Sequence, residues 1–205
     1  MKFIIHINKH TVVPIDKVFW ERAFNYAARE LEIEHHRANV DCFFIPLDFE
    51  RMVKFKHFSL GATGLTERGA MFYVVAGAQL APAGQIVKTF FHELTHVKQL
   101  LMGELIEKRR MFVWKGEKWN KREYAFAPWE QEANAFSDRS YDRFLRREVR
   151  RLMEEENKHA YDVRAALHGV FPDDDVFRLT QELHRERDKR APAVSSERDW
   201  LMVDS

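Results

Sequence analysis

One segment of the 205-residue chain constrains its fold more than any other, and it reads QIVKTFFHELTHVKQLLMG at 85–103. Its spacing predicts a helix that ends at Gly103, a residue type common just after a helix C-terminus. Apolar residues lie around most of its circumference: Ile86, Val87, Phe90, Phe91, Leu94, Val97, Leu100 and Leu101. A surface helix carries a narrower apolar stripe, so we expect this helix to be central and buried.

Three polar residues interrupt this apolar helix, and they are His92, Glu93 and His96 in the motif H-E-L-T-H. Histidines four residues apart lie one turn apart on the same face, so both imidazoles can bind one cation. Glu93 is offset by about 100° around the helix, where its carboxylate can take a proton from water and pass it to a leaving amine. Buried unpaired polar groups cost free energy. A bound metal explains all three residues better than a chance match does.

A catalytic zinc ion needs a third protein ligand and an open fourth position. Met102 stands where an extended H-E-x-x-H-x-x-G-x-x-H pattern would place a histidine, so the ligand must come from elsewhere. The segment 128–134 offers Glu130 and Glu132, which point about 200° apart on a helix. Glu130 is favoured, because Asn134 would share its face and could hydrogen-bond a ligating histidine. Glu132 remains the alternative ligand, and it could instead stabilise the helix N-terminus.

Hydrophobic periodicity and turn residues predict the other elements. Strands are expected at 2–8, 41–47 and 69–76. Helices are expected at 15–33, from 129 into the 150s, and from about 174 to 189. A hairpin is expected at 111–124 with its turn at Lys115–Gly116, and the GATG segment at 61–64 indicates a loop.

These elements predict an α+β fold. We expect a small mixed sheet packed on the active-site helix, with a helix bearing the third ligand beside it. Residues 1–155 would form this domain, and residues 156–205 would form a helical C-terminal extension that ends in a loose tail.

Composition excludes several classes of protein. Lysine and arginine number 33 against 32 acidic residues, which argues against nucleic-acid binding over the whole surface. A hydrophobic content of 45% excludes a disordered chain, and the single cysteine, Cys42, excludes a disulfide framework or a cysteine-rich zinc module. The N-terminus lacks the features of a signal peptide, and no run of about 18 apolar residues is present. We therefore expect a soluble cytoplasmic protein with no membrane partner.

The H-E-L-T-H motif, followed downstream by E-Q-E-A-N at 130–134, resembles the gluzincin zinc metallopeptidases. It is similar to the small intracellular ImmA/IrrE-type peptidases among them. The resemblance implies a zincin-like, minimal thermolysin-like core over about residues 1–150. It also implies zinc on His92, His96 and Glu130, with Glu93 as the general base. The last residue of the second motif is Asn, where the family often has Asp.

In such folds an edge strand pairs with the extended peptide substrate. The strand at 69–76 is a candidate for that role, and an ordinary core strand is an equal alternative. Tyr124 is a candidate hydrogen-bond donor to the tetrahedral oxyanion, although a packed loop tyrosine is the favoured interpretation.

The predicted function is zinc-dependent hydrolysis of peptide bonds in a peptide or protein substrate. One alternative is an SprT-like protease recruited to nucleic acid by an arginine stripe, for which a solvated helix face is the favoured interpretation. The stripe comprises Arg139, Arg143, Arg146, Arg147, Arg150 and Arg151. A second alternative is a non-catalytic, metal-stabilised binding module. Glu93 argues against it, because a structural metal site needs no general base.

Overall fold

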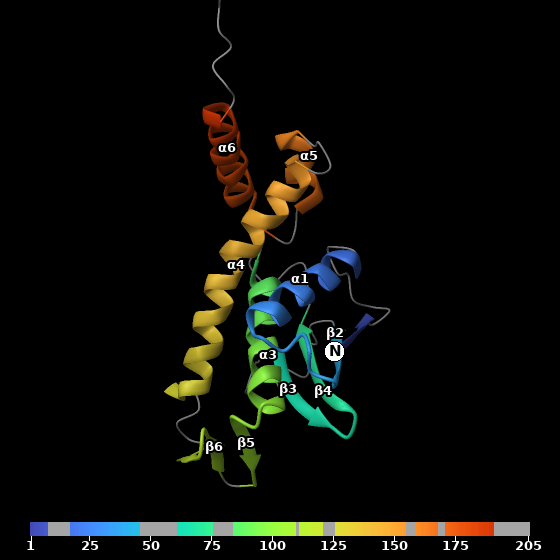
Figure 1. Cartoon of the computed structure of the whole chain (residues 1–205), viewed down its shortest axis with the longest axis vertical. Helices are drawn as coiled ribbons and strands as arrows, with labels where there is room; N and C mark the ends of the chain where they lie inside the picture. The colour runs from blue at the N-terminus through green and yellow to red at the C-terminus, as the bar shows by residue number, and fades with distance from the viewer. Residues whose placement is uncertain are drawn as a thin grey trace, which may run out of the picture.

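The central helix predicted from the sequence is α3 (Gln85–Leu101), and most of its side chains are buried. A computed structural model of the chain describes residues 1–7, 17–45, 61–75, 84–109, 111–120, 126–154, 159–167 and 171–190. Figure 1 shows α3 between α4 (Pro128–Glu154) and a β-sheet, and it contacts both. The predicted α+β class, with a small mixed sheet and packed helices, is confirmed.

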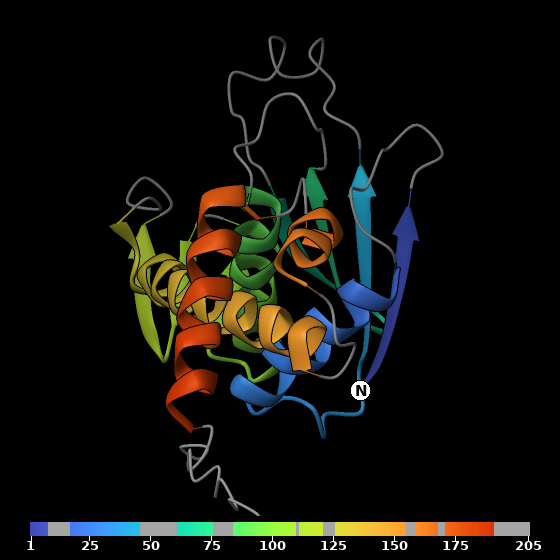
Figure 2. The same cartoon turned by 90° about the horizontal axis from the view of Figure 1, so that it is seen from above.

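The sheet beside α3 has four strands in the order β1, β2, β4, β3. Strands β1 (Lys2–Ile7), β2 (Asn39–Ile45) and β4 (Gly69–Val75) are parallel, whereas β3 (Gly61–Thr66) runs antiparallel to β4. Helix α1 (Lys17–Glu30) lies between β1 and β2 in the chain, as expected for a parallel pair that needs a long crossover. Helices α1 and α3 pack on the same face of this sheet (Figure 2).

One prediction about this sheet is wrong, and the structure decides between two alternatives that the sequence left open. The GATG segment at 61–64 is not a loop, because it forms most of β3 and pairs with β4 across a two-residue turn at Glu67–Arg68. Its two glycines have a low propensity for strands, but the hydrogen bonds to β4 outweigh this propensity. The strand at 69–76 corresponds to β4, which lies inside the sheet between β2 and β3, so it is the ordinary core strand and not the edge strand of the two alternatives. The edge strand nearest the H-E-L-T-H helix is therefore β3.

Aromatic side chains fill the space between the sheet and its helices. The rings of Trp20 in α1 and Phe90 in α3 lie 5.1 Å apart, centroid to centroid. Trp20 also packs on Phe44 of β2, and Phe90 packs on Phe72 of β4. Each ring is at most 1% exposed, and burying a side chain of this size contributes about 1.5–3 kcal/mol. This core fixes α3 against the sheet.

A second, antiparallel sheet follows α3 and contains β5 (Leu105–Lys108), β6 (Met111–Trp114) and β7 (Glu117–Asn120). The predicted hairpin is confirmed over residues 111–120, with its turn at Lys115–Gly116, and residues 121–124 lie outside the described residues. Both turn residues have positive φ angles, 45° and 90°, as a two-residue type I′ turn requires. The sheet packs against Trp129, the second residue of α4, in a small hydrophobic cluster of its own.

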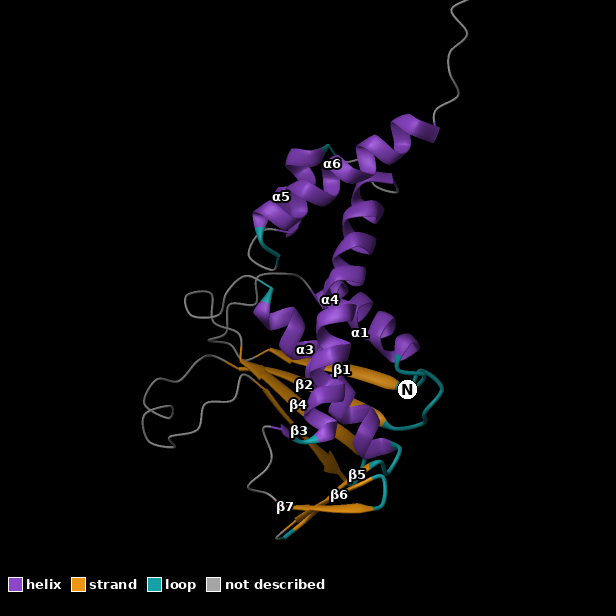
Figure 3. Ribbon diagram, turned by 90° about the vertical axis from the view of Figure 1, so that its left-hand side faces the viewer, coloured by secondary structure: helices purple, strands orange, loops and turns teal. Residues whose placement is uncertain are grey.

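The remaining helices are α5 (Ala160–Leu167) and α6 (Asp173–Arg190), which pack against α4. They lie at the end of α4 that is far from β5–β7 (Figure 3). Their buried residues, such as Val163 and Leu179, belong to the same hydrophobic cluster as the core around α3. The predicted loose tail at 191–205 lies outside the described residues. Within the described ranges, no helix is long and apolar enough to cross a membrane.

Candidate metal centre

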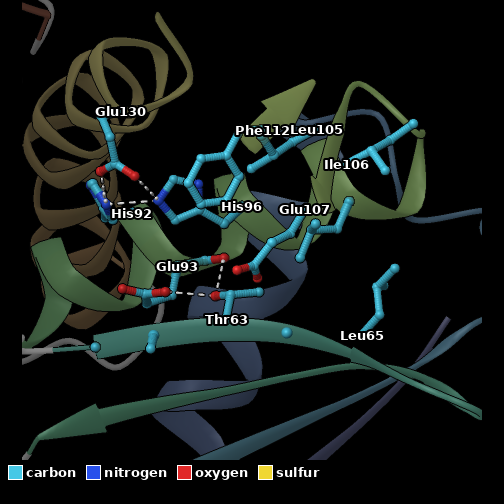
Figure 4. A pocket seen from close by; sticks show the side chains of 14 residues that line it. Thr63, Leu65, His92, Glu93, His96, Leu105, Ile106, Glu107, Phe112 and Glu130 are labelled. Carbon is cyan, nitrogen blue, oxygen red and sulfur yellow. Dashed lines mark hydrogen bonds and ion pairs between the residues drawn. The ribbon is translucent and has the colours of Figure 1, made fainter. Parts of the chain in front are cut away.

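Three side chains meet between α3 and the first turn of α4: His92 and His96 of α3, and Glu130 of α4. The Nε2 atoms of the two histidines lie 3.0 Å apart. Glu130 places Oε2 3.2 Å from His92 Nε2 and Oε1 3.3 Å from His96 Nε2. The dashed lines in Figure 4 mark these contacts. The structure thus brings together the three residues that the sequence predicts as metal ligands.

The spacing of these donor atoms fits a zinc ion. Zinc binds imidazole nitrogen and carboxylate oxygen at about 2.0–2.2 Å in a tetrahedral arrangement, which places neighbouring donors about 3.3–3.5 Å apart. The three separations in the structure run from 3.0 to 3.3 Å, at or slightly below this range. The three donor atoms lie close enough together to bind one ion, and two imidazoles with a carboxylate form a donor set typical of catalytic zinc.

Glu130 reaches the histidines because the start of α4 is fixed by the second sheet. Pro128 is the first residue of α4, a position that suits its restricted φ angle. Trp129 is fully buried, and its ring centroid lies 5.1 Å from that of Phe112 and 6.0 Å from that of Trp119. With Trp129 held in this cluster, the next side chain points toward α3.

Glu132, the alternative third ligand, points elsewhere. Its carboxylate lies 3.2 Å from Nζ of Lys98 and 3.6 Å from Nζ of Lys115. Its direction differs from that of Glu130, as expected for residues two apart on a helix. Glu130 is therefore the glutamate of the pair that the structure places beside the histidines.

Glu93 lies next to the donor group but contributes no atom to it. Its side chain is buried against the edge strand β3, where the Thr63 hydroxyl donates a hydrogen bond to Oε2 at 2.6 Å. A Cβ atom on Gly61 would lie 2.5 Å from Glu93 Oε1, so position 61 requires glycine for this packing. Two residues of β3 thus determine where the carboxylate lies.

Burial changes the proton affinity of the groups at this site. Desolvation raises the pKa of Glu93, and the Thr63 hydrogen bond and the nearby histidines oppose that rise only in part. Burial lowers the pKa of His96, but Glu130, together with Glu93 and Gln99, more than offsets this and leaves the pKa raised. A carboxylate with a raised pKa is a stronger base, which suits Glu93 to accept a proton from water.

The partner of His96 differs from the prediction. Asn134 was expected to hydrogen-bond a histidine, but its side chain is exposed. Nδ1 of His96 instead lies 2.8 Å from Oε1 of Gln99, a fully buried residue of α3. The sequence signal for Gln99 is a polar residue inside an otherwise apolar helix, three positions after His96.

A cavity of about 610 Å³ opens in front of the three donors, between β3, α3 and the second sheet. This volume is typical of ligand-binding pockets. Figure 4 shows the donors and Glu93 at one side and apolar residues at the other. The apolar wall includes Leu65, Leu100, Leu105, Ile106 and Phe112. The cavity therefore combines a few polar groups with apolar surface.

Two further candidates have different outcomes. Tyr124, the candidate oxyanion donor, lies outside the described residues. Each arginine of the stripe on α4 interacts with a side chain of the same chain. The pairs are Arg139 with Phe136, Arg143 with Glu30, Arg146 with Glu182, Arg147 with Tyr26, Arg150 with Glu186, and Arg151 with Glu148. Arg139, Arg143, Arg147 and Arg150 are exposed, so the stripe is mainly a solvated helix face whose arginines also contact neighbouring side chains.

Comparisons with known proteins add no relative. No protein-family model matches this chain, and no curated protein or solved structure is significantly similar to it. The assignment of a function therefore depends on the chemistry of the site itself.

Proposed function

We propose that the protein is a zinc-dependent metallopeptidase with a zincin-like core. One observation carries the proposal: a buried carboxylate, Glu93, lies beside a group of three zinc-type donors without belonging to it. A site that only binds metal has no use for such a carboxylate, whereas hydrolysis needs a base at this position.

His92, His96 and Glu130 would hold the zinc ion. When bound, zinc supplies Lewis-acid chemistry, which polarises the scissile carbonyl and acidifies water. Glu93 accepts a proton from the attacking water on its carboxylate as the new C–O bond forms. It then gives that proton to the leaving amine nitrogen as the C–N bond breaks, which regenerates its ionised form. Thr63 and Gly61 keep the carboxylate in place.

The substrate of such an enzyme is an extended peptide segment. Residues Gly61–Leu65 of the edge strand β3 line the cavity beside the donors. An edge strand can pair with added peptide through main-chain hydrogen bonds, and we assign this role to β3. The apolar wall across the cavity would bind a substrate side chain.

The two alternative functions receive less support. Recruitment to nucleic acid through the arginine stripe would compete with the ion pairs that these arginines form with glutamates of α1, α4 and α6. A binding module without turnover would gain nothing from Glu93, since burying a carboxylate costs free energy. Both observations favour the peptidase.

The substitution Glu93→Gln tests the proposal, because it keeps the size of the side chain and removes the basic oxygen. We expect zinc content and fold to be retained, and cleavage of a broad peptide library to fall by about 10²–10⁴-fold. Glu132→Gln is the matched control, because it removes a carboxylate outside the cavity and should leave cleavage unchanged. Equal cleavage by wild type and Glu93→Gln, or a protein that binds no zinc, would contradict the proposal.

A further inference from the structure

Gln99 is a buried polar side chain next to the candidate metal centre. It is fully buried in α3, and both ends of its amide have partners. Oε1 lies 2.8 Å from Nδ1 of His96, and Nε2 donates to the backbone carbonyl of Trp129 at 3.0 Å. One side chain thus connects a histidine of α3 to the first turn of α4.

The chemistry of these contacts fixes the direction of the amide. A backbone carbonyl can only accept a hydrogen bond, so the NH₂ group of Gln99 must face Trp129. The amide oxygen then faces His96, and an oxygen can only accept. Nδ1 of His96 must therefore carry the hydrogen, which in the neutral ring leaves the electron pair on Nε2.

That electron pair points to where the other donors meet. Nε2 of His96 lies 3.0 Å from Nε2 of His92 and 3.3 Å from Oε1 of Glu130. The opposite tautomer would direct an N–H group at the same point and prevent coordination. A polar partner on the second ring nitrogen commonly fixes the tautomer of a metal-binding histidine.

The second bond of Gln99 acts on the third ligand. Trp129 directly precedes Glu130, so a bond to the Trp129 carbonyl positions the backbone that carries the Glu130 side chain. The aromatic cluster holds Trp129 by its ring, and Gln99 holds it by its main chain. Two separate contacts therefore set the start of α4 relative to α3.

We propose that Gln99 is a positioning residue that sets the tautomer of His96 and the placement of Glu130 for zinc binding. The inference rests on the proposed function for the identity of the metal. The tautomer, however, is a property of the metal-free protein and can be measured independently of zinc and of hydrolysis.

The first test is long-range ¹H–¹⁵N NMR of the metal-free protein at alkaline pH, where the imidazoles are neutral. His96 of the wild type should show nitrogen shifts of the Nδ1–H tautomer, and Gln99→Leu should lose this preference. An Nε2–H tautomer in the wild type would overturn the inference. A wild type that shows the Nδ1–H form but binds no zinc would overturn the proposed function alone.

The second test separates the two bonds by zinc titration against a competing chelator. Gln99→Leu removes both bonds and should weaken zinc binding by about 10–100-fold, the effect typical of such partners. Gln99→Glu keeps an acceptor for His96 Nδ1–H and loses the donor to Trp129, so it should keep the tautomer and lose less affinity than Gln99→Leu. Equal losses in both variants would show a structural role only.

Gln131→Leu is the matched control, because Gln131 also donates to a backbone carbonyl, that of Phe126, but is exposed. It should bind zinc as tightly as the wild type. Unchanged zinc affinity in Gln99→Leu would overturn the inference. Should Gln99→Leu fail to fold, the wild-type spectrum and Gln99→Glu still decide the question.

Discussion

Helix α4 carries two buried glutamates, Glu130 and Glu148, that differ in the kind of side chain facing the carboxylate. Glu130 and Glu148 are separated by 18 residues, or five helical turns, so they lie on the same face. They are 8% and 1% exposed. Burying either carboxylate as an ion requires a partner of opposite charge.

Glu148 has permanent partners. Arg22 of α1 donates to it from Nε and Nη2, with the shortest distance at 2.8 Å, and Arg151 donates at 3.2 Å. A guanidinium is charged at every pH at which the protein is folded. Glu130 instead faces two imidazoles, so positive charge is present beside it only when an imidazole is protonated or when a cation is bound. The same helix face thus carries one self-sufficient ion pair and one site suited to an exchangeable cation.

The largest effect is expected at the exchangeable site. Glu130→Ala should weaken zinc binding by more than 100-fold, because it removes a donor rather than a partner of a donor. Glu132→Ala is the control and should change the affinity little, since Glu132 is paired with lysines. Chelator competition measures both variants. The reverse ranking would assign the third ligand to Glu132.

An intermediate effect is expected at the self-sufficient pair. Glu148→Gln should lower the free energy of unfolding by about 2 kcal/mol, because two partly buried guanidiniums lose their counter-charge. The melting temperature should then fall by about 4–8 °C, with or without zinc. Thermal melts of metal-free and zinc-loaded protein provide the measurement. A loss seen only in the zinc-loaded form would contradict the distinction between the two sites.

The smallest effect concerns Glu93 in the metal-free protein. Its pKa is raised above the ordinary 4.5, so the folded state holds the proton more tightly than the unfolded chain does. Stability is therefore lost as pH rises from 4.5 through the raised pKa. Because Gln imitates the protonated carboxyl, Glu93→Gln should stabilise the protein at neutral pH by about 1 kcal/mol.

Chemical denaturation at neutral pH and below pH 4.5 checks this prediction. The difference between wild type and variant should disappear at the lower pH, where both side chains are uncharged. A variant less stable than wild type at neutral pH would mean that the Thr63 hydrogen bond outweighs the cost of burying Glu93.

Much of the fold could be predicted because its signals are local. The strong periodicity of α3 and the proline before Trp129 identified the two helices of the site. The order of the strands is not local. Strand β3 contains two glycines and resembles a loop by composition, and only its pairing with β4 makes it a strand. The sequence therefore left open whether the strand at 69–76 lies at the edge, and it missed β3, which does.

The site shows the same limit. His92 and His96 share one helix, so helical geometry alone places them together. Glu130 was preferred over Glu132 because Asn134 would share its face, yet Asn134 is exposed and Gln99 contacts His96 instead. The structure places Glu130, the favoured glutamate, beside the histidines. It does so because Trp129 packs in the second cluster, and helical spacing alone cannot predict this packing.

The segment between His96 and Glu130 must lose conformational entropy before its two ends can form one site. Glu130 follows His96 by 34 residues, and closing a flexible loop of that length costs roughly 3 kcal/mol. Gln99 and the cluster around Trp129 close this loop through protein contacts alone. Folding therefore already brings Glu130 beside the histidines, and a cation that binds there would not have to close the loop. Doubling the length of a loop costs only about 0.6 kcal/mol more. The hairpin turn at Lys115–Gly116 is exposed, so residues could be inserted there without displacing Glu130.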